Sequence, residues 1–166
     1  MGTKGASGLK KIIVGSNTGD VLTRVHCSTL VVPENAKYEK PQEIAFPTDF
    51  SSFYSIELLQ PILEILDQYQ ASISVLHINK KGATLNLDQQ INKGYLEDYF
   101  ANNNFNFHHL TNNSLESAIQ SFVEKRKVNL ITMVAKNLNY FQRILFHPTI
   151  KEISYHTDIP FLVLHE

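Results

Sequence analysis

Short apolar runs alternate with amphipathic stretches from Glu43 to Glu166, and this alternation limits the fold more than any other feature of the chain. The expected strands are residues 43–46, 72–78, 104–110, 129–134 and 161–164. The expected helices lie at 56–66, at 85–100, from Ser114 as a cap, and at 139–156. The alternation predicts an α/β fold, a five-stranded parallel sheet with right-handed crossovers and helices on both faces. We expect the strand order 3-2-1-4-5.

Local signals refine this picture. Ser51 or Ser52 is placed to cap the first of these helices, and Pro61 inside its apolar stripe should kink or restart it. Ligands of open α/β sheets bind at the carboxyl ends of the strands, where the strand order reverses. Asp49 ends the first strand and Met133 ends the fourth, so with the expected order the two would face each other across that crevice.

The start of the chain returns in degraded form at its end. Gly2, Gly5 and the pair Gly15-Ser16 precede an apolar segment at 30–32. The matching positions are Met1 and Met133, Lys4 and Lys136, Ile12 and Ile144, and Val31 and Val163. Residues 9–26 fit a helix and residues 29–32 fit a short strand. A repeat of long period indicates two copies of one structural unit.

The first copy has no counterpart for the residues between 42 and 133. We therefore expect residues 1–34 to be the C-terminal remnant of a first domain, 35–41 to be a polar linker, and 42–166 to be a complete second domain. Met1 would then be an internal or alternative start. The alternative is a small native domain that begins with a helix and a strand.

The composition excludes several classes of protein. A formal charge of −1 and a pI near 6.7 give no basic field for binding nucleic acid. The lone Cys27 cannot form an internal disulfide, and we interpret it as a buried small hydrophobe. No apolar run approaches the roughly 20 residues that cross a bilayer, and the opening residues do not resemble a signal peptide. We expect a soluble, cytoplasmic protein without membrane or nucleic-acid partners.

The spaced glycines have a chemical meaning. Glycine before a helix lets the backbone approach an anion closely, and the helix start supplies unpaired N–H donors and a partial positive charge. Gly15-Ser16 adds a further pair of N–H groups and a hydroxyl. Such a loop can hold a polyphosphate without a basic cluster, although spaced glycines alone are a weak signal.

Taken together with Pro47-Thr-Asp49-Phe-Ser and Val75-Leu-His77-Ile78, the glycine motif makes nearly the whole chain resemble the universal stress protein family. The resemblance implies a five-stranded parallel α/β fold, tandem or dimeric pairing, and binding of ATP or AMP in one subset of members. It also assigns roles by position. Gly2, Gly5, Gly15 and Ser16 match contacts to phosphate and ribose. In the second unit, Asp49 matches the residue near the ribose, the backbone of Ile78 matches the adenine contact, and Met133 begins the degraded motif.

The second unit departs from this motif. Val134, Asn137 and His147 replace the three glycines, and Pro148 replaces the serine. Valine adds a branched side chain where the backbone must approach the ligand, and proline removes an N–H donor. We therefore expect nucleotide binding in the first domain of the full protein and its loss in the second. No ATP or AMP is expected on this chain. A compensating interpretation gives His147 a phosphate contact.

Other polar residues have simpler explanations. A carboxylate at a strand end, such as Asp49, can equally be a loop acceptor, so both interpretations stay open. His108 and His109 are neighbours on an expected strand and point to opposite faces, so they are not a metal pair. We find no catalytic constellation and expect no enzyme, although weak ATP hydrolysis stays open.

Two functional hypotheses follow. The first is a nucleotide-responsive stress module, as above. The second is a structural pairing module. The resemblance implies that the terminal strand pairs with that of a partner, so residues 29–32 would add antiparallel to residues 161–164 and extend the sheet by one strand. The apolar face of the 9–26 helix should then drive self-association. A related enzyme, such as an adenylyl transferase or a pyrophosphatase, ranks third because its signature loops do not appear in the sequence.

Overall fold

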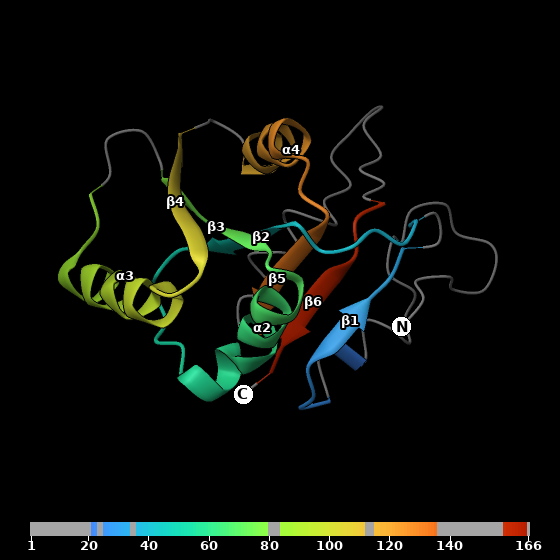
Figure 1. Cartoon of the computed structure of the whole chain (residues 1–166). Helices are drawn as coiled ribbons and strands as arrows, with labels where there is room; N and C mark the ends of the chain where they lie inside the picture. Colours follow the sequence, from blue (N-terminus) through green and yellow to red (C-terminus); the bar gives the residue numbers. More distant parts are fainter. Residues whose placement is uncertain are drawn as a thin grey trace.

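A computed structural model describes residues 21–22, 25–33, 36–79, 84–111, 115–135 and 158–165. Within them, one mixed sheet lies between helices on its two faces (Figure 1). The strands are β1 (Thr29–Val31), β2 (Glu43–Thr48), β3 (Ser72–Asn79), β4 (Asn104–Thr111), β5 (Leu130–Val134) and β6 (Phe161–Leu164). The helices are α2 (Ile56–Tyr69), α3 (Leu87–Phe100) and α4 (Leu115–Arg126).

The strand order is β1-β6-β5-β2-β3-β4. The five strands from β2 onward are parallel and follow the predicted order 3-2-1-4-5. The sheet has six strands rather than five, because β1 adds antiparallel to β6 with Thr29 opposite Val163 and Val31 opposite Phe161. The predicted pairing of these two segments within one chain is therefore confirmed.

Helix α2 begins at Ile56, as its apolar stripe predicted, but its cap is a different serine from the two predicted. Its N-cap is Ser55, whose hydroxyl accepts a hydrogen bond from the Leu58 N–H at 3.2 Å. The prediction of Ser51 or Ser52 was wrong because Ser51 is held by Asp49 instead. Pro61 does not restart the helix, which is continuous from Ile56 to Tyr69.

Helix α3 starts with a capping box. The Asn86 side chain accepts from the Gln89 N–H at 2.9 Å, and the Gln89 side chain accepts from the Asn86 N–H at 3.0 Å. Together these two bonds satisfy donors at the helix start that have no partner inside the helix.

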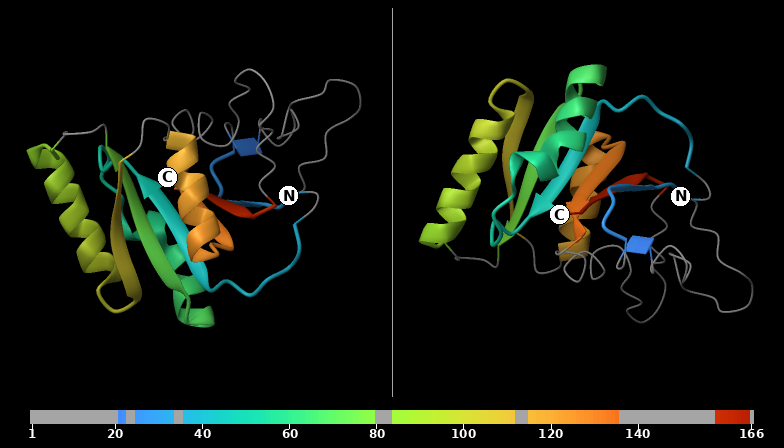
Figure 2. Two further views of the ribbon diagram at one scale, coloured as in Figure 1. Left: turned by 90° about the horizontal axis from the view of Figure 1, so that it is seen from above. Right: turned by 90° about the horizontal axis from the view of Figure 1, so that it is seen from below.

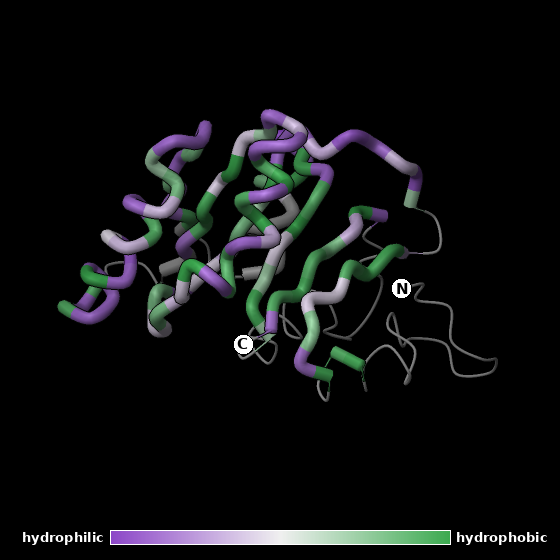
Figure 3. Tube along the Cα trace, turned by 60° about the horizontal axis from the view of Figure 1, so that its bottom comes forward, coloured by the Kyte–Doolittle hydropathy of each residue, from purple (hydrophilic) through white to green (hydrophobic). Residues whose placement is uncertain are grey.

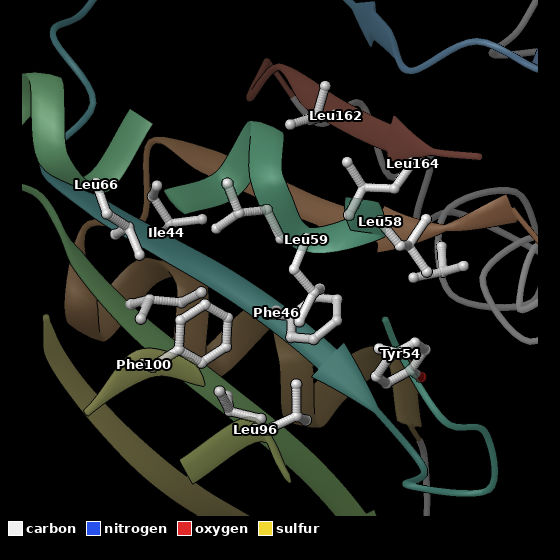
Figure 4. Packing of buried hydrophobic residues seen from close by; sticks show 14 of the residues in the cluster. Ile44, Phe46, Tyr54, Leu58, Leu59, Leu66, Leu96, Phe100, Leu162 and Leu164 are labelled. Carbon is white, nitrogen blue, oxygen red and sulfur yellow. The ribbon is translucent and has the colours of Figure 1, made fainter. Parts of the chain in front are cut away.

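Alternation along the strands divides the core into two clusters, one on each face of the sheet. Ile44 and Phe46 pack with α2 and α3, whereas Ala45 packs on the α4 side with Phe122 and Val123. Figure 4 shows the first cluster, in which α2 lies over β2 and β6, and Figure 2 shows how the helices flank the sheet. Full burial of a side chain such as Ile44 or Phe46 stabilises the folded state by roughly 1.5–3 kcal/mol relative to leaving it exposed.

Leu22 is helical and buried in the α4-side cluster, but the rest of the predicted 9–26 helix lies almost wholly outside the described residues. So do the Ser114 cap and the predicted helix at 139–156. Residues 36–42 form neither helix nor strand and run as a polar segment toward β2 (Figure 3). Cys27 is exposed, so its prediction as a buried residue was wrong. No helix among the described residues is long and apolar enough to cross a membrane.

Candidate functional site

The strand order reverses between β2 and β5. These strands are parallel neighbours, with Ile44 opposite Leu130 and Ala45 opposite Ile131. From β2 the chain continues to β3 on one side, and from β5 it continues to β6 on the other. Their carboxyl ends therefore mark the position at which open α/β sheets bind ligands. Asp49 directly follows β2, as predicted.

Asp49 is half-buried and engaged in its own turn. Its Oδ1 accepts from the Ser51 N–H at 2.9 Å and from the Ser51 hydroxyl at 2.7 Å. Its backbone carbonyl accepts from the Gln89 amide at 2.8 Å. This is an Asx turn, in which the aspartate side chain mimics a backbone hydrogen bond. The structure thus shows Asp49 as a loop acceptor.

Phe50, the next residue, adopts a left-handed backbone with φ of 57°. Such a conformation costs a residue with a Cβ roughly 1–2 kcal/mol. Two bonds hold it, because the Phe50 N–H donates to Thr48 Oγ1 at 3.0 Å and the Phe50 carbonyl accepts from the Asn92 amide at 2.8 Å. The ring is fully buried and stacks on His77, with centroids 4.7 Å apart. Packing of the ring therefore offsets the backbone strain.

His77 lies beneath this loop on β3 and is only 2 % exposed. Its Nδ1 is 3.1 Å from the Thr48 carbonyl oxygen, so Nδ1 carries the proton and donates. Its Nε2 is buried and has no hydrogen-bond partner among the described residues. His109 meets the ring edge-on at 5.8 Å. His77 therefore ties the end of β2 to β3.

Two histidines on β4, His108 and His109, have lowered pKa values. Burial lowers the pKa of His109 from its ordinary value, and the nearby His77 and Lys93 lower it further. Burial also lowers the pKa of His108 on the opposite face, helped by Arg126 and opposed by Glu43. The two adjacent histidines face different groups, as their alternation predicted.

The structure also describes the other residues predicted near the nucleotide in the second unit, apart from His147. The backbone of Ile78 lies near the carboxyl end of β3, one position after His77, which is opposite Thr48. The side chain of Met133 is fully buried in the α4-side core cluster, and the predicted role of this residue in a nucleotide site stays a prediction. Val134 is 1 % exposed and packs in the opposite cluster.

Gly2, Gly5, Gly15, Ser16 and His147 lie outside the described residues. Their predicted roles stay predictions.

Sequence reasoning missed the residues that support the Asp49 loop. Phe50, Gln89 and Asn92 carry no motif, and their roles depend on contacts between β2 and α3. Residues alternate between the two faces along β3, so His77 shares a face with Ile73 and Val75, and this position also fits an ordinary core residue. Among the described residues, no group of three or more candidate ligands could hold a metal ion.

No protein-family model matches the sequence, and no curated protein is similar to it. Solved structures do match. A universal stress protein from Archaeoglobus fulgidus DSM 4304 aligns over 97% of this chain with a TM-score of 0.65 and 17% identity. The chain spans 59% of that protein's length.

Two further structures align over about three quarters of this chain. A universal stress protein solved in complex with cAMP aligns with 76% of this chain, and the alignment includes 98% of that protein. The TM-score is 0.53 and the identity is 14%. A family protein from Burkholderia pseudomallei covers 78%, with 100% of its own length, a TM-score of 0.52 and 13% identity. The sheet order, the helices on its two faces and these alignments together show that this chain has the universal stress protein fold.

Proposed function

We propose that this chain belongs to a non-catalytic stress-response protein in which an adenine nucleotide binds the glycine-bearing first unit and the unit at 42–166 serves as its partner. The observation that carries the proposal is the antiparallel pairing of β1 with β6. This pairing joins the last strand of the proposed first unit to the last strand of the second. The Archaeoglobus fulgidus protein supports a two-unit arrangement, because it aligns with almost all of this chain and is much longer.

The local geometry of the second unit supports the loss of nucleotide binding there. Asp49 already satisfies its Oδ1 through Ser51, and the Met133 side chain is buried. Val134 fills core space at the position where the motif has its first glycine. A bound nucleotide would have to break the Asx turn or approach a backbone that carries a branched side chain.

Adenine nucleotides are proposed as the ligand class because the glycine pattern suits a phosphate group and the family resemblance implies ATP or AMP. The cAMP bound by one structural neighbour belongs to the same chemical class. The proposed binding residues are Gly2, Gly5, Gly15 and Ser16.

Isothermal titration calorimetry with ATP and AMP tests the proposal. A protein that carries both complete units should bind ATP, and Gly5→Val should abolish this binding because the added side chain blocks close approach of the phosphate. Asp49→Asn is the matched control in the second unit and should leave the affinity unchanged. The chain of 166 residues alone should show no saturable binding. Saturable binding by this chain that Asp49→Asn removes would refute the assignment of the site.

The second candidate function is a structural pairing module without any nucleotide. The same β1 and β6 ladder favours it, because β1 covers the edge of β6 and Val31 is fully buried. If a two-unit protein binds no ATP while Val31→Asp disrupts its folding, the pairing function is the one to keep.

A further inference from the structure

The sheet ends on one side in a long open strand. β4 is the last strand in the order, and within the described part of the chain it pairs with β3 alone (Figure 1). The register with β3 is unbroken from Asn104 opposite Ser72 to Thr111 opposite Asn79. One side of β4 therefore presents backbone N–H and C=O groups that another extended chain can pair with.

β4 also lacks the features that usually protect such an edge. Its sequence, NFNFHHLT, contains no lysine, arginine, acidic residue or proline, and its continuous register leaves no bulge. The opposite edge differs, because β1 has only three residues and Pro33 follows shortly after it. The two edges of the sheet are thus unequal, and β4 is the one suited to recruit a strand.

We propose that β4 pairs antiparallel with β4 of a second copy, forming a dimer through the edge opposite to β1. A second copy fits because the strand carries no lysine, arginine or acidic residue, so the two facing strands bring no such charges together, and Lys93 over the Phe107 ring is paired with Glu97. A two-fold axis perpendicular to the sheet keeps the α3-side residues of both copies on the same face. This interface is independent of the proposed nucleotide site.

Symmetry restricts the register. Residues opposite each other must share a face, so the axis lies between two copies of the same residue, and the greatest overlap of the strands makes that residue Phe107 or His108. In the first register His109 lies opposite Phe105 of the second copy, and in the second it lies opposite Phe107. Both phenylalanines are half-buried in the single chain, so either register covers apolar surface that is now in contact with water.

The edge should respond to pH through its two histidines. On the α3 side, His109 faces His77 of β3 and Lys93 of α3. On the α4 side, His108 faces Arg126 of α4 and Glu43 of β2, and its ring packs on Phe122. The pKa of both histidines is lowered, mainly by burial, so both are neutral at pH 7. Acid would charge both histidines of each copy, and in the register centred on His108 the two His108 rings would face each other, so protonation should weaken the dimer.

Sedimentation equilibrium from micromolar to millimolar concentration measures the association. One strand pair buries less than a standard interface of about 1,600 Å², so a weak, concentration-dependent dimer is expected. Asn106→Lys adds a charge at an exposed edge position and should weaken dimerisation at least tenfold, whereas Gln60→Lys adds the same charge at an exposed position of α2 and should leave it unchanged. Acidification to about pH 5 should also weaken the wild-type dimer.

Amide hydrogen exchange on the wild-type chain tests the interface without any substitution, so misfolding of a variant cannot affect the result. The outward N–H groups of β4 should gain protection as the concentration rises, while those of α2 stay unchanged. A chain that remains monomeric at millimolar concentration would overturn the proposal. So would a dimer that Asn106→Lys leaves intact, or one that forms without added protection in β4.

Discussion

Replacing Phe50 by alanine and, separately, by glycine should invert the usual stability ranking of these two residues. Glycine is ordinarily less stable than alanine by roughly 0.5–1 kcal/mol, because it loses more backbone freedom on folding. At Phe50, with φ of 57°, the alanine Cβ instead meets the left-handed penalty of roughly 1–2 kcal/mol that glycine escapes. Phe50→Gly should therefore be more stable than Phe50→Ala by about 0–1.5 kcal/mol, with the middle of that range the expected value.

Both variants should be much less stable than the wild type. The Phe50 ring is fully buried and stacks on His77, so its removal leaves a cavity. Truncation of a buried phenylalanine to alanine typically costs about 3–5 kcal/mol. The wild type already bears the backbone strain, so Phe50→Ala should show the whole of this loss and Phe50→Gly a smaller one.

Urea denaturation followed by circular dichroism measures the difference, provided that the slope of the transition is the same for both variants. Phe46 supplies the control, because it is equally buried but lies inside strand β2. There the usual ranking should hold, with Phe46→Gly less stable than Phe46→Ala. If glycine is also the less stable residue at position 50, the left-handed turn does not have the energetic role assigned to it.

Two further predictions concern the helix start and the histidines. Ser55→Ala should cost about 1 kcal/mol in urea melts, because it removes the side-chain acceptor that caps α2; Ser52→Ala should cost little, and an equal loss for both would contradict the capping assignment. The pKa of His108, His109 and His165 is lowered mainly by burial. The three imidazole rings therefore bind a proton more tightly in the unfolded chain than in the folded chain. Their contribution to the unfolding free energy should be fully present above about pH 6.5 and be lost as the pH falls below it, which urea melts at several pH values would show. His108→Gln should flatten this dependence, and greater stability in acid would refute it.

The alternation of strands and helices predicts a parallel sheet with helices on both faces, but it does not by itself determine the strand order, which was an expectation that the structure confirms. The apolar run of β3 and the alternation of β4 predict their strands directly. The repeat identifies the two apolar terminal segments, and the family resemblance implies that β1 and β6 pair. These are properties of patterns spread over many residues, so no single side-chain contact decides them.

Details that depend on competition between neighbours could not be predicted. Ser51 and Ser55 are both plausible caps by composition, and only the bond from Ser51 to Asp49 decides between them. Pro61 predicts an interruption of the helix, yet α2 is continuous through it. Leu59 before the proline and Ile62 after it are both buried in the core cluster, which keeps the two parts of the helix packed on the sheet. The support of the Asp49 loop by Gln89 needs the position of α3, which no local pattern supplies.

The ladder between β1 and β6 has a mechanical consequence. Thr29 is opposite Val163 and Val31 is opposite Phe161, so the chain enters β1 at the same end of the ladder at which it leaves β6. Tension applied between the two termini would therefore peel the strands apart one hydrogen-bonded pair at a time, instead of shearing all pairs together. The first element to yield under load should be β1, while the five parallel strands stay folded.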